Sequence, residues 1–154
     1  GTGTFHDSGP FDTATTVDLT YRYESGVTVY CQTDREENGV TFFGEQGTIS
    51  VGRGRLQAEP ASLLDWEPGE NDVCLYRSEN HLRNFFECVR SRRQPIAPAE
   101  VGHRSATVCH LGNVAIRLGR RLQWNPETEE FVDDPEANSL RDRDVRQIPP
   151  RRAE

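Results

Sequence analysis

The chain has 154 residues, of which 34% are hydrophobic and 28% charged, and a formal net charge of −7. This length suffices for one domain with its own hydrophobic core. The acidic balance argues against nucleic acid as the main partner, because phosphate-binding surfaces are basic, and no apolar run approaches the roughly 20 residues that span a bilayer.

Two residue types are missing from the chain. It has no methionine and begins Gly-Thr-Gly-Thr, so we interpret it as a piece of a longer protein. It also has no lysine, since all 18 basic residues are arginines, and lysine chemistry such as a Schiff base or a Walker-type phosphate contact is excluded. The four cysteines have no zinc-site spacing. We expect free, mostly buried thiols, with a disulfide pair of a secreted protein as the alternative.

Residues 14–59 have the pattern of five short strands. The segment TTVDLTYRYE alternates, which places Val17, Leu19, Tyr21 and Tyr23 on one face, and Gly26 lies at the turn into VTVYCQT. The segments VTFFG, TISVG and GRLQA follow after turns too short for the crossovers that parallel strands require. We therefore predict an α+β fold with an open, mainly antiparallel β-sheet.

Two helices are predicted after an irregular crossing over residues 60–78, and both are expected to pack on one face of the sheet. Ser78 can cap the first helix, ENHLRNFFECVRSRR. Its apolar residues recur at i, i+3, i+4 and i+7 and should face the core. They are Leu82, Phe85, Phe86 and Val89.

The second helix should begin near Pro98 and end at Gly119, which suits a C-terminal cap. Residues 1–140 would then form one domain. Residues 141–154, RDRDVRQIPPRRAE, have little to bury and should form an extended tail.

The second helix has one apolar stripe and one polar stripe on a helical wheel. The apolar stripe comprises Val101, Val108, Leu111, Ala115, Leu118 and Leu122. His103 and His110 lie on the polar side, roughly 10 Å apart along the axis, too far to share a metal ion directly. A plain solvated face is the first interpretation of this side, and the lining of a cleft is the alternative.

Arg104 lies within the apolar stripe, so its side chain must either extend past the start of the helix to reach solvent or meet a carboxylate. We expect a largely buried ion pair with Glu100, Asp18 or Glu59, whose loss would cost about 3–5 kcal/mol, while His103 stays partly exposed. The alternative is that His103 and Arg104 bind substrate, because a guanidinium suits carboxylates and paired hydroxyls.

No catalytic, cofactor-binding or metal-binding residue can be assigned from the motifs. The segment VGRGR contains one G-x-G, but it lies between two strands rather than at a strand-to-helix turn and lacks the third glycine. Physical reasoning from the residues alone thus gives an α+β domain with no catalytic centre of its own.

Three segments carry a resemblance to a known family. They are FDTATTVDLTYRYESGVTVYC, GVTFFGEQGTISVGRGRLQAEP and HLRNFFECVRSRRQPIAPAEVGHRSATVCHLGNVAIRLGRRLQWNPETEEFVDDPEAN. They resemble the C-terminal α/β domain of the glucose–fructose oxidoreductase / inositol dehydrogenase / MocA family, in the bacterial branch abundant in planctomycetes. The resemblance runs through Leu140, whereas the tail lacks the Tyr-Arg-type ending usual in that branch.

The resemblance implies a parent enzyme that uses NAD or NADP and acts on a sugar or polyol. Its catalytic lysine and the Asp and His near it belong to motifs absent from this chain, so no catalytic residue carries over. The implied role is that of a substrate-cleft wall and subunit interface. The implied partners are the parent's own Rossmann domain and a second copy bound through the sheet face, in the cytoplasm.

Two other readings stay open. One is the same domain from a relative that uses NAD transiently to break a glycosidic bond. The other is a freestanding sugar-binding or assembly module without a Rossmann partner.

The absence of a glycine-rich strand-to-helix turn predicts that this chain alone binds neither NAD nor NADP, because no helix N-terminus is prepared for the pyrophosphate. Isothermal titration calorimetry with NADH checks this. Micromolar binding to the isolated chain would contradict the assignment of the cofactor site to another part of the protein.

Overall fold

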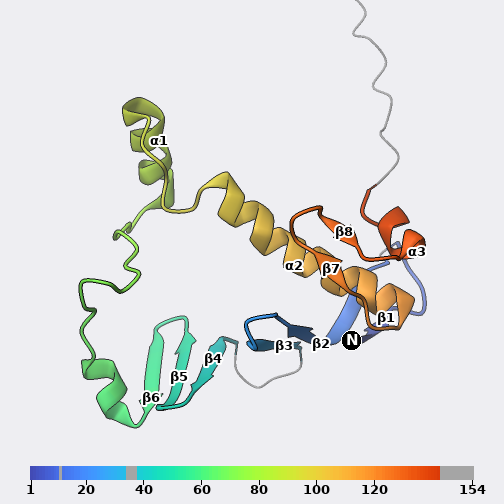
Figure 1. Ribbon diagram of the computed structural model, residues 1–154, viewed down its shortest axis with the longest axis horizontal. Helices are drawn as coiled ribbons and strands as arrows, with labels where there is room; N and C mark the ends of the chain where they lie inside the picture. Colours follow the sequence, from blue (N-terminus) through green and yellow to red (C-terminus); the bar gives the residue numbers. More distant parts are fainter. Residues whose placement is uncertain (11, 34–37, 143–154) are drawn as a thin grey trace, which may run out of the picture. The chain divides into compact units, whose positions relative to one another are not determined.

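The computed structural model describes residues 1–10, 12–33 and 38–142. They belong to two compact units, one formed by residues 1–33 with 102–154 and the other by residues 34–101. Small antiparallel sheets and helices make up both units (Figure 1), so the predicted α+β class is confirmed. The tail predicted over 141–154 falls, from residue 143 onward, outside the described residues.

The first unit contains a three-stranded sheet in the order β1 (Thr2–Phe5), β2 (Ala14–Arg22) and β3 (Thr28–Gln32). Both pairings are antiparallel. Gly26, with φ of 89°, makes the predicted turn, and the Val27 carbonyl accepts from the Tyr23 amide at 2.9 Å. The predicted face of β2 is confirmed for three of its four residues, since Leu19 is buried and Val17 and Tyr21 are half-buried. Tyr23 lies beyond the end of β2 and is exposed.

The edge strand β1 was not predicted, because TGTF is short and has a glycine at its centre. That glycine has a packing reason. Gly3 lies opposite Val17, and a Cβ at this position would lie 2.8 Å from the Thr16 carbonyl oxygen and 3.0 Å from Ile116 Cγ2. A side chain here would therefore separate the edge strand from the helix beneath it.

The long helix α2 (Ala99–Leu118) packs on the inner face of this sheet. The Tyr21 hydroxyl donates to the Val108 carbonyl at 3.0 Å, and burial raises the pKa of Tyr21 to about 12. Gly112 lies against the same tyrosine, and a Cβ here would come within 2.7 Å of Leu19 Cδ1. The helix ends as predicted at Gly119, with φ of 62°.

A second layer covers the other side of α2. It consists of the hairpin β7 (Trp124–Asn125) and β8 (Glu130–Phe131) and the short helix α3 (Pro135–Ser139). Val114 packs there with Phe131 and Ala137, which are 2% and 0% exposed. The single apolar stripe predicted for this helix is therefore too narrow: Val114 and Ile116 are buried although they lie outside it, because α2 is enclosed on two sides.

A charged cluster joins the end of α2 to the start of α3. The Asp134 carboxylate accepts from the Ala137 amide at 3.0 Å, which caps α3, and from Arg120 Nη2 at 2.8 Å. The same guanidinium donates to Glu136 at 2.9 Å. The hydrogen bond from Arg120, aided by that from Ala137, lowers the pKa of Asp134 to about 2.

The second unit has its own three-stranded antiparallel sheet of β4 (Val40–Gly44), β5 (Gly47–Gly52) and β6 (Arg55–Glu59), followed by the 3-10 helix η1 (Ala61–Asp65). All five predicted strands are present, but in the described residues they are divided between two sheets rather than joined in one. The connection between β3 and β4 is the longest between any two of these strands, and strands pair most readily across tight turns.

The helix α1 (His81–Ser91) has its N-terminal cap two residues after the predicted one. Asn80, not Ser78, accepts from the Arg83 amide at 2.9 Å. The loops around it are fastened to Asn84, which donates to the Tyr76 hydroxyl at 2.9 Å and accepts from the Ile96 amide at 3.1 Å.

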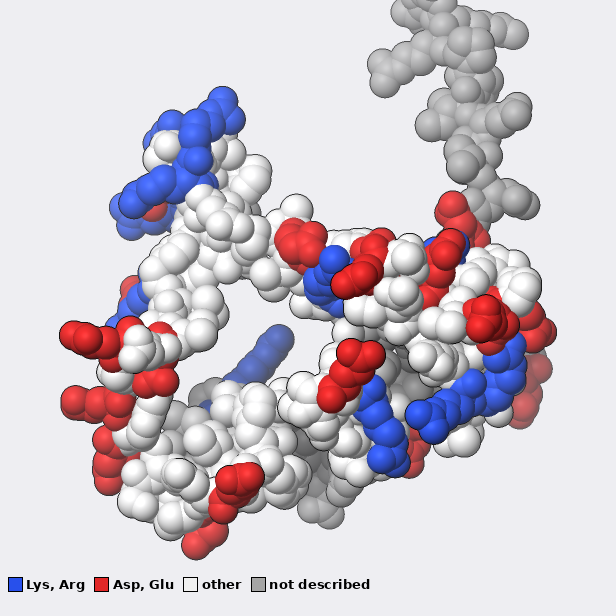
Figure 2. Space-filling view, viewed as in Figure 1, with Lys and Arg blue, Asp and Glu red and all other residues white. Residues whose placement is uncertain are grey.

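The apolar stripe of α1 was predicted to face the core, but its four side chains are between 45% and 61% exposed. The contacts through Asn84 lie on another side of the helix. Basic side chains gather at α1 and just beyond its end (Figure 2), where the sequence has Arg83, Arg90, Arg92 and Arg93.

All four cysteines are free, as predicted. The expectation that most are buried is wrong: Cys31, Cys74 and Cys109 are exposed and Cys88 is half-buried. Cys31 lies on the edge strand β3, Cys74 in the loop before α1, Cys88 on α1 and Cys109 on α2. Within the described part of the chain, no helix combines the length and apolar character needed to cross a bilayer.

The two glycines inside α2 make a matched pair for a stability prediction. Gly112→Ala should destabilise the domain by about 1–3 kcal/mol through overpacking against Leu19 and Tyr21, although alanine is the better helix former. Gly102→Ala meets no atom within 4 Å and should stabilise by about 0.5–1 kcal/mol. Urea unfolding of both variants measures this, and equal effects of the two substitutions would contradict the packing argument.

The Arg120–Asp134 cluster predicts an acid limit to stability. Because the pKa of Asp134 is lowered in the folded state, its contribution is complete above the ordinary carboxyl value and is lost as the pH falls from about 4 toward 2. Asp134→Asn should therefore lower the melting temperature at pH 6 and converge with wild type near pH 2. Thermal melts across this range check the prediction, and a constant difference would disprove it.

Candidate functional site

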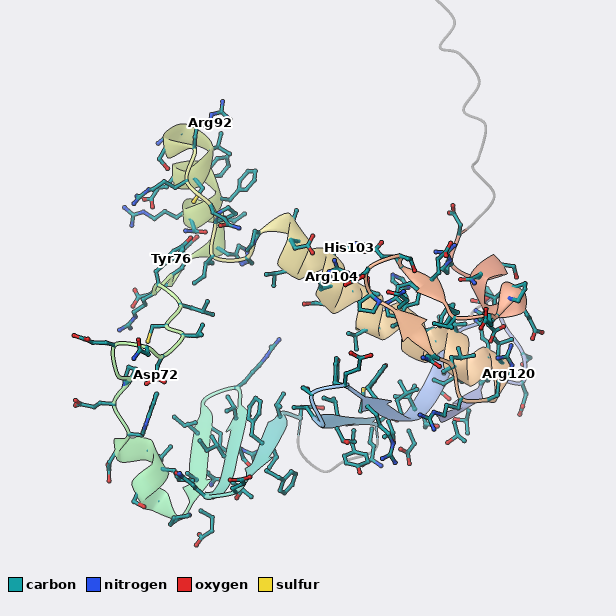
Figure 3. The ribbon with its side chains drawn as sticks, in the orientation of Figure 1. Asp72, Tyr76, Arg92, His103, Arg104 and Arg120 are labelled. Carbon is teal, nitrogen blue, oxygen red and sulfur yellow. The ribbon has the colours of Figure 1, made fainter. Side chains whose placement is uncertain are left out.

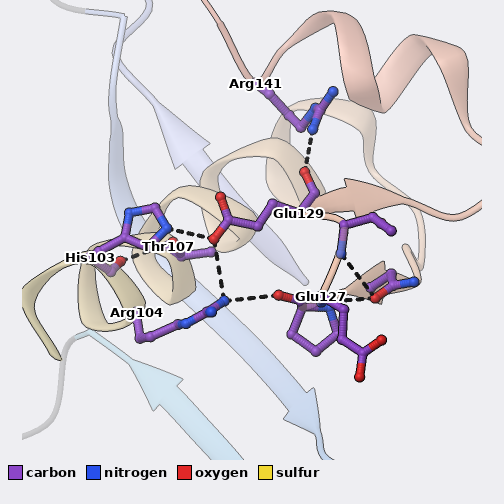
Figure 4. Close-up of polar contacts among 9 residues, drawn as sticks. His103, Arg104, Thr107, Glu127, Glu129 and Arg141 are labelled. Carbon is purple, nitrogen blue, oxygen red and sulfur yellow. Dashed lines mark hydrogen bonds and ion pairs between the residues drawn. The ribbon is translucent and has the colours of Figure 1, made fainter. Parts of the chain in front are cut away.

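His103 and Arg104 lie in the first half of α2, beside the turn of the β7–β8 hairpin (Figure 3). The sequence grouped these two residues as substrate contacts or as an ion pair. The structure brings both of them to one carboxylate that the sequence argument did not identify, that of Glu129 (Figure 4).

The two basic side chains converge on a single oxygen atom. His103 Nε2 lies 2.6 Å from Glu129 Oε1, and Arg104 Nη1 lies 3.3 Å from the same oxygen. Arg104 Nη1 also donates to the Pro126 carbonyl at 2.9 Å. The pair therefore fastens both the backbone and a side chain of the hairpin turn to α2.

Local contacts in the turn point Glu129 toward the helix. The Asn125 side chain accepts from the amides of Glu127 and Thr128, at 2.9 and 3.4 Å, which is the Asx-turn pattern. Glu129 then adopts a left-handed backbone with φ of 55°, and Arg141 donates to its carbonyl oxygen. The segment NPETE thus carried a turn signal, but nothing in it indicated a contact with α2.

The electrostatics of the cluster favour an ionised carboxylate. The hydrogen bond from His103, followed by the charges of His103, Arg104 and Arg141, lowers the pKa of Glu129. All three side chains keep solvent contact, with exposed fractions of 50% for His103, 48% for Arg104 and 40% for Glu129.

These contacts correct the expectation for Arg104. It forms an ion pair with Glu129, a carboxylate that the sequence argument did not name, and the side chain is half-exposed rather than buried. Its position within the apolar stripe is accounted for by the hairpin, which covers that side of α2. Solvent-exposed ion pairs contribute little to stability, so Arg104→Ala should cost much less than the loss of a buried ion pair would. The partial exposure predicted for His103 is confirmed.

The arrangement holds one carboxylate between an imidazole and a guanidinium. In the described ranges no group of three or more His, Cys, Asp or Glu side chains could hold a metal ion. A shallow, open hollow lies where β6 meets η1, lined among others by Ser50, Gln57 and Glu59. Contacts of His103 and Arg104 with a substrate stay a prediction.

Comparison with known proteins gives one match. A family model described as the oxidoreductase family, C-terminal alpha/beta domain, of the Gfo/Idh/MocA group, matches residues 10–149 and so extends past Leu140 into the tail. No curated protein and no solved structure matches the chain. The predicted bacterial branch stays a prediction. Because the family model covers most of the 154 residues, the chain belongs to the Gfo/Idh/MocA oxidoreductase family, as its C-terminal alpha/beta domain.

Proposed function

We propose that this chain is the substrate-side and oligomerisation domain of an NAD(P)-dependent oxidoreductase that acts on a sugar or polyol. The observation that carries the proposal is the match of residues 10–149 to the C-terminal domain of an oxidoreductase family. The sequence supports this proposal, because it has no lysine and no glycine-rich nucleotide-binding turn. The cofactor site and the catalytic lysine would therefore belong to another domain of the parent enzyme.

The sheet of the first unit offers a surface for pairing two copies. Alternation along its strands puts side chains on the face away from α2 that are mostly hydroxylic, including Thr2, Thr16, Thr20, Thr28 and the exposed Tyr30. A homodimer through this face would be hydrogen-bonded and hydrated rather than strongly apolar. The proposal is therefore a dimer of moderate affinity, which sedimentation over a range of concentrations measures.

The substrate cleft would lie where His103 and Arg104 meet the hairpin. Both side chains are half-exposed, and a guanidinium and an imidazole suit the paired hydroxyls of a sugar. In this role Glu129 would orient the two donors, because its carboxylate fixes both side chains.

The test is the full-length gene product with NAD⁺ or NADP⁺ and a panel of sugars and polyols, followed at 340 nm. Reduced nicotinamide should accumulate with at least one of them, and His103→Ala or Arg104→Ala should raise KM more than they lower kcat. Free sugar released without net reduction would instead identify the glycosidase reading. A reading frame without a nucleotide-binding motif, together with no turnover, would favour the freestanding module and overturn the proposal.

A further inference from the structure

We propose that α1 is a docking surface for a second copy of this chain. The two α1 helices would pack antiparallel through their apolar stripes, and the basic end of each would meet the acidic segment 65–72 of the other copy. This contact lies in the second unit and is separate from the hydroxylic sheet face of the first. The inference depends on neither the substrate nor the cofactor.

The apolar stripe of α1 forms one continuous exposed surface. Its four side chains are 45–61% exposed within the described part of the chain, and the rings of Phe85 and Phe86 meet edge to face, 5.6 Å apart. The contacts that fasten the helix, through Asn84, lie on another side. Apolar residues gathered in a stripe with a polar rim are typical of an interaction surface, whereas single exposed ones are not.

The basic end of α1 carries charges that lack partners. Arg83 is paired with Glu87, one turn further along the helix, at 3.1 Å. By contrast, Arg90, Arg92 and Arg93 take part in no ion pair within residues 1–10, 12–33 and 38–142. The helix dipole favours a cation at this end, but that attraction leaves the guanidinium donors open to a carboxylate.

The segment 65–72, between η1 and α1, has the opposite charge. It reads DWEPGEND and contains four carboxylates and no basic residue. None of the four forms an ion pair within the residues that the structure describes. Trp66, which is 64% exposed, adds an apolar side chain to this acidic surface. Figure 2 shows acidic side chains along this loop and basic ones at the far end of α1. The two surfaces are therefore complementary in charge, and each also offers apolar groups.

The acidic segment and the basic end lie at opposite ends of the same helix. Tyr76 follows the segment, and its hydroxyl accepts from the Asn84 side chain, in the first half of α1, at 2.9 Å. Arg92 caps the other end of the helix, and Figure 3 places Tyr76 between it and Asp72. One copy thus keeps its own complementary charges apart, so a second copy is the partner that can join them.

An antiparallel pair of helices satisfies both surfaces at once. A two-fold axis through the centre of the pair places each basic end beside the acidic segment of the other copy and separates the two basic ends. The apolar stripes then meet at the centre. The dimer should be weak, because eleven residues make only about three helical turns and interfaces below roughly 1,200 Å² are typical of transient complexes.

Charge reversal in the full 154-residue chain tests this contact. One variant carries Arg90→Glu and Arg93→Glu, and the other carries Glu67→Arg and Glu70→Arg. Each places like charges across the contact, so its association constant should fall about ten-fold or more in sedimentation equilibrium at up to about 1 mM protein. An equimolar mixture of the two variants should recover association, because every contact of the mixed dimer again joins opposite charges.

Two matched controls separate this contact from general effects. Arg53→Glu with Arg121→Glu makes the same change in net charge at exposed positions and should leave association within about two-fold of wild type at about 0.15 M salt. Phe86→Ala should weaken association about five-fold or more, whereas Phe43→Ala, on the 82% exposed side chain of β4, should not. Circular dichroism verifies that each variant is folded.

Three outcomes would overturn the proposal. One is an unmodified chain that stays monomeric over the whole concentration range. Another is a mixture that associates no better than its two components, which would place the charge contact within one copy. The third is association that the α1 variants leave unchanged, which would show that the copies pair through another surface, such as the sheet of the first unit.

Discussion

The enclosure of α2 between two layers is the constraint on which the first unit depends. One side of the helix lies against β1–β3, where Gly112 allows Tyr21 and Leu19 to approach its backbone. The other side buries Val114 against Phe131 and Ala137. A helix placed in this way cannot shift along its axis without losing contacts in both layers, because packed interiors tolerate few voids. The position of every polar side chain on α2 follows from this.

The polar groups at the two ends of α2 attach the second layer to the helix, as the apolar core does at its centre. His103 and Arg104 hold the hairpin turn near its start, and Arg120 holds Asp134 and Glu136 just beyond its end. The small second layer, made of two-residue strands and a five-residue helix, is thereby attached at both ends as well as at its apolar centre. Elements this short gain little from their own hydrogen bonds, so such attachments matter more for them than for the sheet.

The sequence correctly predicted the features that depend on local periodicity or on one glycine with a positive φ. Alternation located five strands, Gly26 and Gly119 marked a turn and a helix end, and the polar stripe with His103 and His110 is exposed. It failed where a contact joins distant parts of the chain. Glu129 lies 26 residues from His103, and its approach depends on the Asn125 turn and on a hairpin too short to show a period. The same limit applies to the division of the strands into two sheets and to the burial of Val114.

Three of the four thiols are exposed, and this determines how the protein reacts with oxidants and with labels. Cys31 and Cys109 lie in the first unit and Cys74 in the second, whereas Cys88 is half-buried on α1. Thiolate reactivity follows access to solvent, so alkylating probes should modify the three exposed residues before Cys88, and air oxidation should join molecules through intermolecular disulfides. With no lysine in the chain, thiol reagents are also the route by which a fluorophore can be attached to a chosen side chain in either unit.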